Sequence, residues 1–173
     1  MSHWEKVLDA TMQARAADLF AYAHTLTGDD AVAARVVEDA LAAVFGRRGY
    51  PRTVDEAVVA LEHAMRRAAV RVHEAPSPGT DTPDGADRAS SLPDDLHHLP
   101  TRERALLAMR YVDGLAVAAI GEETGLHRGA IETALTHAVE ELAATHPDLR
   151  LSLEDALEGG SLAQDEVTIG GDR

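Results

Sequence analysis

A stretch rich in proline, glycine and aspartate, APSPGTDTPDGADRASS at residues 75–91, divides this 173-residue chain into two parts. The stretch has no apolar periodicity, and a segment of this composition cannot repay the entropy of ordering it. Apolar residues recur at helical spacing on both sides of it. The chain is therefore expected to form two small domains, at residues 1–74 and 99–144, with a flexible linker over 75–98 and an acidic tail over 145–173.

The first part carries three stretches of helical periodicity. From Trp4 to about Leu26, apolar residues recur every three or four positions, as one buried stripe of a helix requires. Thr27-Gly28-Asp29-Asp30 then ends this helix and caps a second one, whose stripe extends to Phe45. A third helix is predicted from about Val54 to Val72, so this part should be a three-helix unit.

The second part shows the order helix, tight glycine turn, helix. Leu99-Pro100 leads into a helix with Thr101 as its expected N-cap, which Asp113-Gly114 ends. A short helix over about 116–123, a turn at Gly125 and a last helix over about 128–144 follow, which is the helix-turn-helix pattern. Beyond Pro147 the sequence predicts at most a short helix from Ser152 to Leu157.

Composition supports an all-α fold and excludes several classes of function. Aromatic residues make up only 3% of the chain, while alanine, leucine and valine recur throughout, a balance that favours packed helices over sheets. Because there is no cysteine, the chain cannot form a disulfide, a thiolate metal site or a cysteine nucleophile. No signal peptide or membrane-spanning stretch is visible, so a cytoplasmic location is expected.

No motif for catalysis or metal binding stands out. The nine histidines are scattered, with no HExxH pattern, and there is no phosphate-binding glycine loop or GxSxG elbow. His97-His98 are interpreted as linker residues, because adjacent residues on a helix point in different directions. The chain is therefore expected to be no enzyme and to bind no metal or cofactor.

The net charge argues against strong binding to nucleic acid. Sixteen Lys and Arg residues stand against 30 Asp and Glu, a formal charge of -14, which by itself repels phosphate backbones. The excess of acid is largest in the linker and the tail, and blocks of this kind are usually solvated segments. The tail could also fold over the second domain and mask it, a second interpretation that composition leaves open.

Two segments carry a resemblance to a known family. LPTRERALLAMRYVDGLAVAAIGEETGLHRGAIETALTHAVEEL, residues 99–142, resembles the domain of sigma factors that binds the promoter -35 element. LFAYAHTLTGDDAVAARVVEDALAAVF, residues 19–45, is similar to the polymerase-binding domain of the same family. Both lie in family order, so the chain resembles an extracytoplasmic-function (group IV) sigma-70-family factor. This implies a region 2-like three-helix domain and a region 4-like, four-helix domain with a helix-turn-helix.

The resemblance also implies partners and sites. The expected partners are the RNA polymerase core, promoter DNA and an anti-sigma factor. The positions that match the polymerase-docking surface are Arg35, Glu38, Asp39 and Leu41. The candidate DNA-binding residues come from the basic stripe of the third helix, the preceding turn and the last helix: Arg47, Arg48, Arg66, Arg67, Arg71, His127, Arg128, Thr133 and His137.

The sequence departs from the family pattern at two places. Leu61, Arg67 and Arg71 stand where the family usually has an aromatic residue, an Asn and an Asp in the pocket that captures a flipped base. The predicted recognition helix has one arginine, Arg128, and three glutamates, although phosphate contacts supply most non-specific affinity. These departures motivate a second hypothesis, a sigma-like module that binds proteins and has lost DNA binding. An orphan helical protein of unrelated function is a third.

Overall fold

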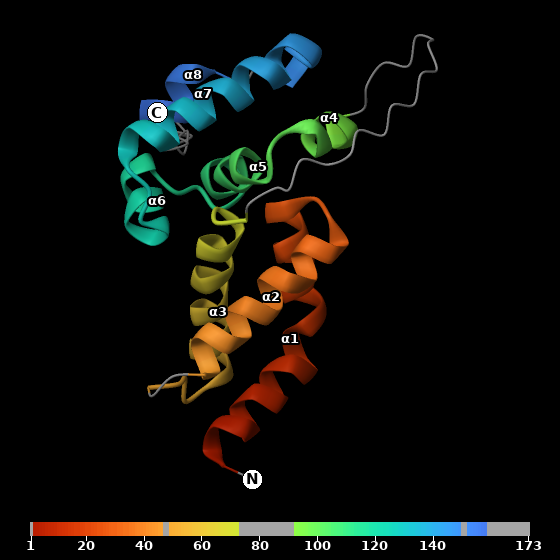
Figure 1. The fold of residues 1–173 in the computed structure, drawn as a ribbon, viewed down its shortest axis with the longest axis vertical. Helices are drawn as coiled ribbons and strands as arrows, with labels where there is room; N and C mark the ends of the chain where they lie inside the picture. The colour runs from red at the N-terminus through yellow and green to blue at the C-terminus, as the bar shows by residue number, and fades with distance from the viewer. Residues whose placement is uncertain (1, 47–48, 73–91, 150–151, 159–173) are drawn as a thin grey trace, which may run out of the picture.

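A computed structural model describes residues 2–46, 49–72, 92–149 and 152–158. Within these ranges all regular structure is helical, so the predicted all-α class is confirmed. Figure 1 shows the N-terminal helices, coloured red to olive, in one half of the molecule and the C-terminal helices, coloured green to blue, in the other. We call them the N-terminal bundle (residues 2–72) and the C-terminal bundle (residues 92–158). Among the described helices, none combines the length and the hydropathy needed to cross a bilayer.

The N-terminal bundle consists of α1 (His3–Thr27), α2 (Asp30–Phe45) and α3 (Val54–Ala69). Gly28 ends α1 in the left-handed conformation, with φ of 71°. The side chain of Asp29 then caps α2 by accepting from the backbone N–H of Val32, and Thr53 caps α3 in the same manner. The predicted junction at residues 27–30 is thus confirmed, whereas α3 ends three residues before the predicted Val72.

The C-terminal bundle contains more elements than the sequence predicted. Its elements are α4 (Leu92–His98), α5 (Thr101–Leu107), the π-helical turn η1 (Ala108–Val112), α6 (Val117–Thr124), α7 (Arg128–Thr145), the 3-10 turn η2 (Pro147–Leu149) and α8 (Leu153–Glu158). Of the predicted linker over 75–98, residues 75–91 lie outside the described residues and residues 92–98 are helical. Thr101 is the first residue of α5, and Pro100 holds the N-cap position predicted for Thr101.

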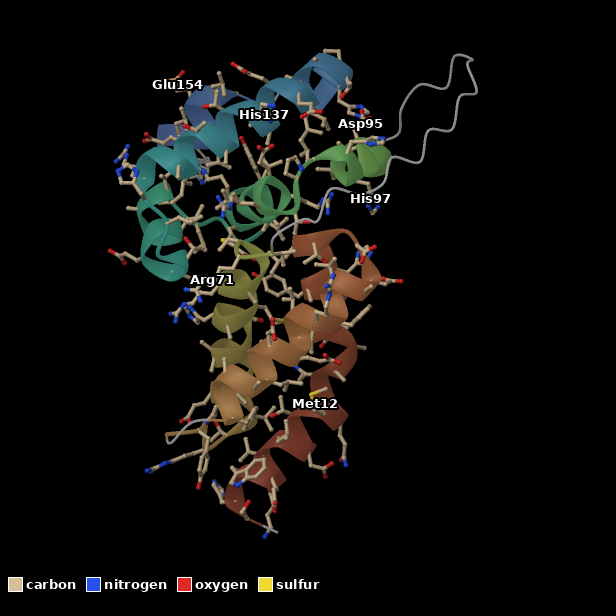
Figure 2. The ribbon with its side chains drawn as sticks, in the orientation of Figure 1. Met12, Arg71, Asp95, His97, His137 and Glu154 are labelled. Carbon is tan, nitrogen blue, oxygen red and sulfur yellow. The ribbon has the colours of Figure 1, made fainter. Side chains whose placement is uncertain are left out.

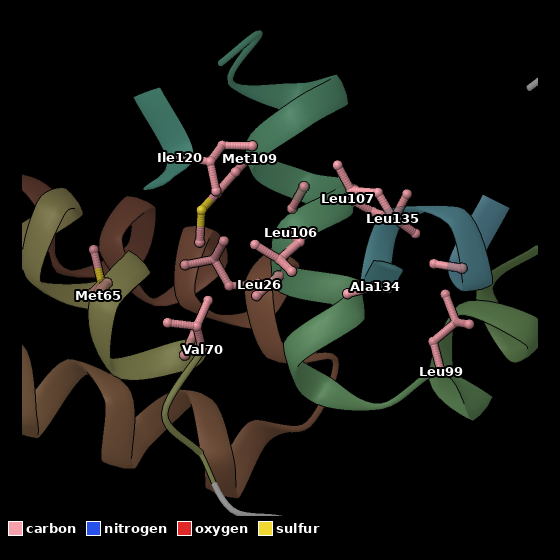
Figure 3. Close-up of a cluster of buried hydrophobic side chains, with 14 of the residues drawn as sticks. Leu26, Met65, Val70, Leu99, Leu106, Leu107, Met109, Ile120, Ala134 and Leu135 are labelled. Atoms are coloured by element: carbon pink, nitrogen blue, oxygen red, sulfur yellow. The ribbon is translucent and has the colours of Figure 1, made fainter. Parts of the chain in front are cut away.

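One hydrophobic cluster joins the two bundles. Leu26 and Val70 from the N-terminal bundle lie in the same group of buried side chains as Leu106 and Met109 from the C-terminal bundle (Figure 3). These four side chains are 1% exposed or less. The end of α1 and the end of α3 therefore pack directly on α5 and η1, which fixes how the two bundles lie against each other.

Candidate nucleic-acid interface and the contact between the bundles

The helix-turn-helix consists of α6, a turn at Gly125 and α7. Gly125 ends α6 with φ of 74°, a conformation that glycine adopts at little cost. His127 begins α7, and its Nδ1 accepts a hydrogen bond from the backbone N–H of Gly129 at 3.1 Å. The predicted DNA-binding residue His127 is therefore the N-cap of the second helix.

The exposed face of α7 carries the other candidate residues. Arg128, Thr133 and His137 are all exposed, and they follow one another along the helix at intervals of four to five residues. The Nε of Arg128 lies 2.6 Å from Oε1 of Glu132, and the Thr133 hydroxyl donates to the carbonyl of Gly129 at 2.8 Å. The single arginine of this face is thus already paired with a glutamate one turn away, so its charge is largely balanced before any ligand binds.

His137 lies in an acidic surrounding. Its Nδ1 is 2.9 Å from Oε2 of Glu103 on α5 and 3.8 Å from Oε2 of Glu141. The hydrogen bond to Glu103, and then the charge of that carboxylate, raises the pKa of His137. The imidazole therefore keeps its positive charge to a higher pH than a free histidine.

The same three residues are the one group of potential metal ligands that comes together in the described part of the chain. Ligand atoms of Glu103, His137 and Glu141 lie within 4.8 Å of one another. His137 already pairs with Glu103, and exposed acidic groups commonly gather without an ion. The arrangement is explained by this pairing and adds no support for a metal site.

Of the basic stripe of α3, Arg66 lies against the C-terminal bundle, whereas Arg67 and Arg71 are exposed. The guanidinium of Arg66 donates from Nε to Asp113 Oδ2 at 3.0 Å and from Nη1 to both carboxylate oxygens of Glu123, at 3.0 and 3.1 Å. Only 12 to 13% of these three side chains is exposed. Charge-assisted hydrogen bonds of this kind are among the strong ones, particularly where little water screens them. Arg66 on α3 is therefore bonded both to the residue that caps the end of η1 and to α6.

Tyr22 and His63 extend this contact. The Tyr22 hydroxyl donates to Asp113 Oδ2 at 2.6 Å and accepts from Arg66 Nε at 2.7 Å, and His63 Nδ1 lies 2.8 Å from Glu123 Oε1. Burial, and then the hydrogen bond to Asp113, raises the pKa of the Tyr22 hydroxyl, so it remains a donor at any working pH. We call these five residues, Tyr22, His63, Arg66, Asp113 and Glu123, the seam network.

The remaining basic candidates fall into three groups. Arg67 Nε donates to the backbone carbonyl of Glu123 at 2.7 Å, so this arginine also contacts the C-terminal bundle. Arg71 is exposed just beyond the end of α3 and has further interactions of its own; its position near α6 is labelled in Figure 2. Arg47 and Arg48 lie outside the described residues.

The candidate polymerase-binding residues share one helix. Arg35, Glu38 and Asp39 are exposed on α2, and the half-buried Leu41 packs against the hydrophobic cluster. A side chain that packs inward and three that face solvent are what about two turns of an amphipathic helix provide. The structure thus brings the three charged candidates together on one exposed stretch of α2.

Sequence reasoning missed the acidic half of the seam network. Asp113 was interpreted only as the end of a helix, and Glu123 as an ordinary residue of the short helix. The bonds that Arg66 makes to them span 47 and 57 residues along the chain. The sequence signalled this contact only through two of the acidic residues in the second part of the chain and a basic stripe on the third helix, and no spacing rule connects residues so far apart.

Two buried arginines were also missed. Arg104 is 8% exposed and donates to the carbonyls of Leu96, His97 and Leu99, at 2.6 to 2.9 Å, which supplies donors to the end of α4. Arg110 is equally buried and donates to the carbonyl of Ala156 in α8 at 3.1 Å. These residues hold α4 and α8 in place.

Comparison with known proteins identifies part of the chain. Residues 94–142 match the family model described as Sigma-70, region 4. The matched segment contains α5, η1, α6 and nearly all of α7, so the helix-turn-helix described above lies in the part of the chain that is similar to sigma-70 region 4. The match does not extend to the N-terminal bundle. No curated protein matches the chain.

Proposed function

We propose that this chain is a sigma-factor-like transcription regulator of the extracytoplasmic-function kind, which binds core RNA polymerase and promoter DNA to direct initiation. The observation that carries the proposal is the region 4 match over residues 94–142, on a segment that folds as a helix-turn-helix. Sigma region 4 implies binding to RNA polymerase and promoter DNA. The three-helix N-terminal bundle, which comes before it in the chain, is the form that a region 2-like domain requires.

In this proposal α7 is the helix that contacts the promoter. Its exposed Arg128 and Thr133 lie in the half of α7 nearer its N-terminus, where a recognition helix contacts base edges, and the exposed His137 lies just past the middle of the helix. Glutamate on the same face repels phosphate, so affinity for DNA alone should be low and the polymerase should supply most of the binding energy. The exposed stretch of α2, with Arg35, Glu38 and Asp39, is the proposed contact with the polymerase.

The experiment that tests the proposal measures binding of the purified chain to core RNA polymerase, then promoter melting by the complex over a salt series. Binding followed by salt-sensitive melting supports a working sigma factor. Replacing Glu38 and Asp39 with lysine should weaken polymerase binding, whereas Asp18→Lys on α1, which breaks only a surface ion pair with Arg15, should not. No polymerase binding by the wild-type chain would sink the proposal.

A matched pair of threonines tests the contact of α7 with DNA. The hydroxyls of Thr133 and Thr145 both donate to the carbonyl four residues earlier, those of Gly129 and Glu141, and both residues are exposed. Thr133→Ala should reduce promoter melting, and Thr145→Ala, at the far end of the same helix, should leave it unchanged. Equal effects of the two substitutions would argue against base contacts at Thr133.

A second candidate function is a protein-interaction module, an anti-sigma decoy or polymerase accessory, that keeps the sigma form without DNA binding. The observation that favours it is the pairing of the basic candidates Arg66 and Arg128 with acidic residues of the chain itself. In the experiment above, this module would bind polymerase or an anti-sigma factor and would not melt a promoter.

A further inference from the structure

An apolar cavity lies where the end of α1 meets the C-terminal bundle. Its volume is about 480 Å³, within the range that sites for small molecules occupy. The end of α1, α4, α5, η1, α7 and η2 all contribute to its lining, which includes five leucines: Leu92, Leu96, Leu107, Leu142 and Leu149. No described member of the seam network or of the DNA-binding candidates lines it, so no role assigned above accounts for this cavity.

Large apolar side chains are exposed around this cavity. Tyr111, Val112 and Leu149 line it with 42, 67 and 37% of their surfaces exposed, and they make up half of the large apolar side chains that are exposed in the described residues. Single exposed apolar residues are ordinary, but a group of them around a hollow is typical of a binding site. The surface therefore favours a ligand that is mainly apolar.

One part of the lining is polar and carries positive charge. Arg104 is 8% exposed, and its Nη2 donates to the backbone carbonyl of His97 at 2.9 Å. The ring of His97, which is labelled in Figure 2, meets the ring of His24 edge to face, with 6.5 Å between their centroids. These three lining residues therefore lie together at one part of the cavity.

The lining lacks the acidic groups that dominate the chain. The formal charge of the chain is -14, yet no Asp or Glu is among the described residues that line the cavity. Asp30, which lies 3.5 Å from Nε2 of His24, is outside this lining. A buried guanidinium attracts an anion strongly because little water screens it, and an imidazole offers an N–H donor whether neutral or charged. The polar part therefore suits a negatively charged group.

We infer that the cavity binds a small anionic amphiphile, a molecule with an apolar body and one carboxylate, of which a fatty acid of medium chain length is the simplest case. The leucines contact the apolar body, and His24 and His97 donate to the carboxylate beside the charge of Arg104. A cationic ligand of the same shape is repelled by that charge. The inference goes beyond the proposed function and does not depend on it.

The test measures binding of sodium decanoate to the full chain by isothermal titration calorimetry, below the concentration at which decanoate forms micelles. Decyltrimethylammonium, which has nearly the same alkyl chain and the opposite charge, is the matched probe. Decanoate should bind with one molecule per chain and roughly tenfold more tightly than decyltrimethylammonium, because about one charge-assisted contact separates the two probes. Decanoate should also raise the melting temperature of the chain, since it binds the folded state.

Two pairs of variants locate the site. Thr25 lines the cavity from an exposed position on α1, so Thr25→Trp narrows the cavity, whereas Ala17→Trp, exposed on the same helix and outside the lining, does not. His97→Leu removes a donor from the polar part, and His98→Leu, also exposed and outside the lining, is its control. Thr25→Trp and His97→Leu should each lower the affinity for decanoate roughly tenfold relative to their controls. All four positions are exposed, so the variants should fold, which circular dichroism checks.

The outcomes that overturn the inference are distinct. If decanoate does not bind the wild type saturably, or if each variant binds it as its control does, the cavity is not the site. Equal affinities for the two probes overturn the preference for an anion. More than one decanoate per chain means general binding to exposed apolar surface, and one per two chains means that a second copy covers the cavity, and both results overturn the inference. A failure to bind core RNA polymerase bears on the proposed function alone.

Discussion

Gly28 is the residue at which the junction of α1 and α2 meets the C-terminal bundle. Its φ of 71° strains any other residue by roughly 1 kcal/mol, and a Cβ there would clash with the guanidinium of Arg104. Arg104 has little freedom to move, because it donates to three backbone carbonyls. Gly28→Ala should therefore lower the free energy of unfolding by about 2 kcal/mol more than the left-handed conformation alone explains.

Gly125→Ala is the matched control for this change, measured by urea denaturation. Gly125 also ends a helix in the left-handed conformation, with φ of 74°, but a Cβ there meets nothing within 4 Å. It should show only the conformational cost. Equal losses for the two variants would mean that Arg104 moves aside freely and that its contacts with the end of α4 contribute little.

His137 offers a second prediction at the scale of a single residue. Its pKa is raised chiefly by the hydrogen bond to Glu103, so Glu103→Gln should lower it toward the value of a free histidine. The folded pKa lies above the unfolded one, so the charged contact stabilises the fold fully below the unfolded pKa and is lost as pH rises through the folded pKa. A nuclear magnetic resonance titration of the ring protons measures the shift. Glu62→Gln, on α3, should leave the pKa of His137 unchanged, and a drop there would contradict the assigned cause.

At the scale of the helix, sequence pattern predicted the elements that have long apolar stripes. The helices α1, α2, α6 and α7 begin and end within a few residues of their predicted bounds. The helix α4 was missed because its seven residues offer only Leu92 and Leu96 as apolar positions, too few to show a period. Its last carbonyls accept hydrogen bonds from the side chain of Arg104, seven and eight residues further along the chain, and this contact leaves no periodic pattern in the sequence.

The candidate site was predicted less well than the fold, for a related reason. The exposed positions of Arg128, Thr133 and His137 follow from the helical period of α7, and the structure has all three facing solvent. The pairing of Arg66 with Asp113 and Glu123 depends on how the two bundles pack, which helical periodicity does not encode. The basic stripe in the sequence therefore indicated a charged helix face, but it could not indicate that Asp113 and Glu123 cover Arg66.

The short helix α8 allows a test of the contact between the tail and the helix-turn-helix domain. Ala156 is fully buried, and its carbonyl accepts from Arg110 at 3.1 Å. Ala156→Glu should release α8, because the larger charged side chain cannot stay buried without a partner. Faster amide hydrogen exchange at residues 153–158 would show this, and Glu154→Ala, at an exposed position of the same helix, should change exchange little. Unchanged protection in Ala156→Glu would mean that other contacts hold α8.

At the scale of the whole molecule, the two bundles behave as one unit if the contacts across the seam are coupled. One hydrophobic cluster spans both bundles, and the seam network adds directional hydrogen bonds at its edge. Removing one member of the seam network leaves its partly buried partners without a hydrogen bond. This loss costs more free energy than a surface ion pair contributes. The chain should therefore unfold in a single transition, although its sequence divides into two parts.

A double-mutant cycle on Tyr22 and Asp113 measures this coupling. The Tyr22 hydroxyl and Asp113 Oδ2 lie 2.6 Å apart across the seam, although the two residues are 91 positions apart in the chain. Tyr22→Phe removes the hydroxyl and should cost about 1 kcal/mol, because Arg66 still reaches Asp113 directly. Combined with Asp113→Asn, the loss should be smaller than the sum of the single losses by roughly 0.5 to 1 kcal/mol.

Thr25→Ser paired with Asp113→Asn is the control, since the Thr25 hydroxyl donates to the carbonyl of Ala21 within α1. Additive losses for Tyr22 and Asp113, or two separate unfolding transitions, would mean that the two bundles fold independently.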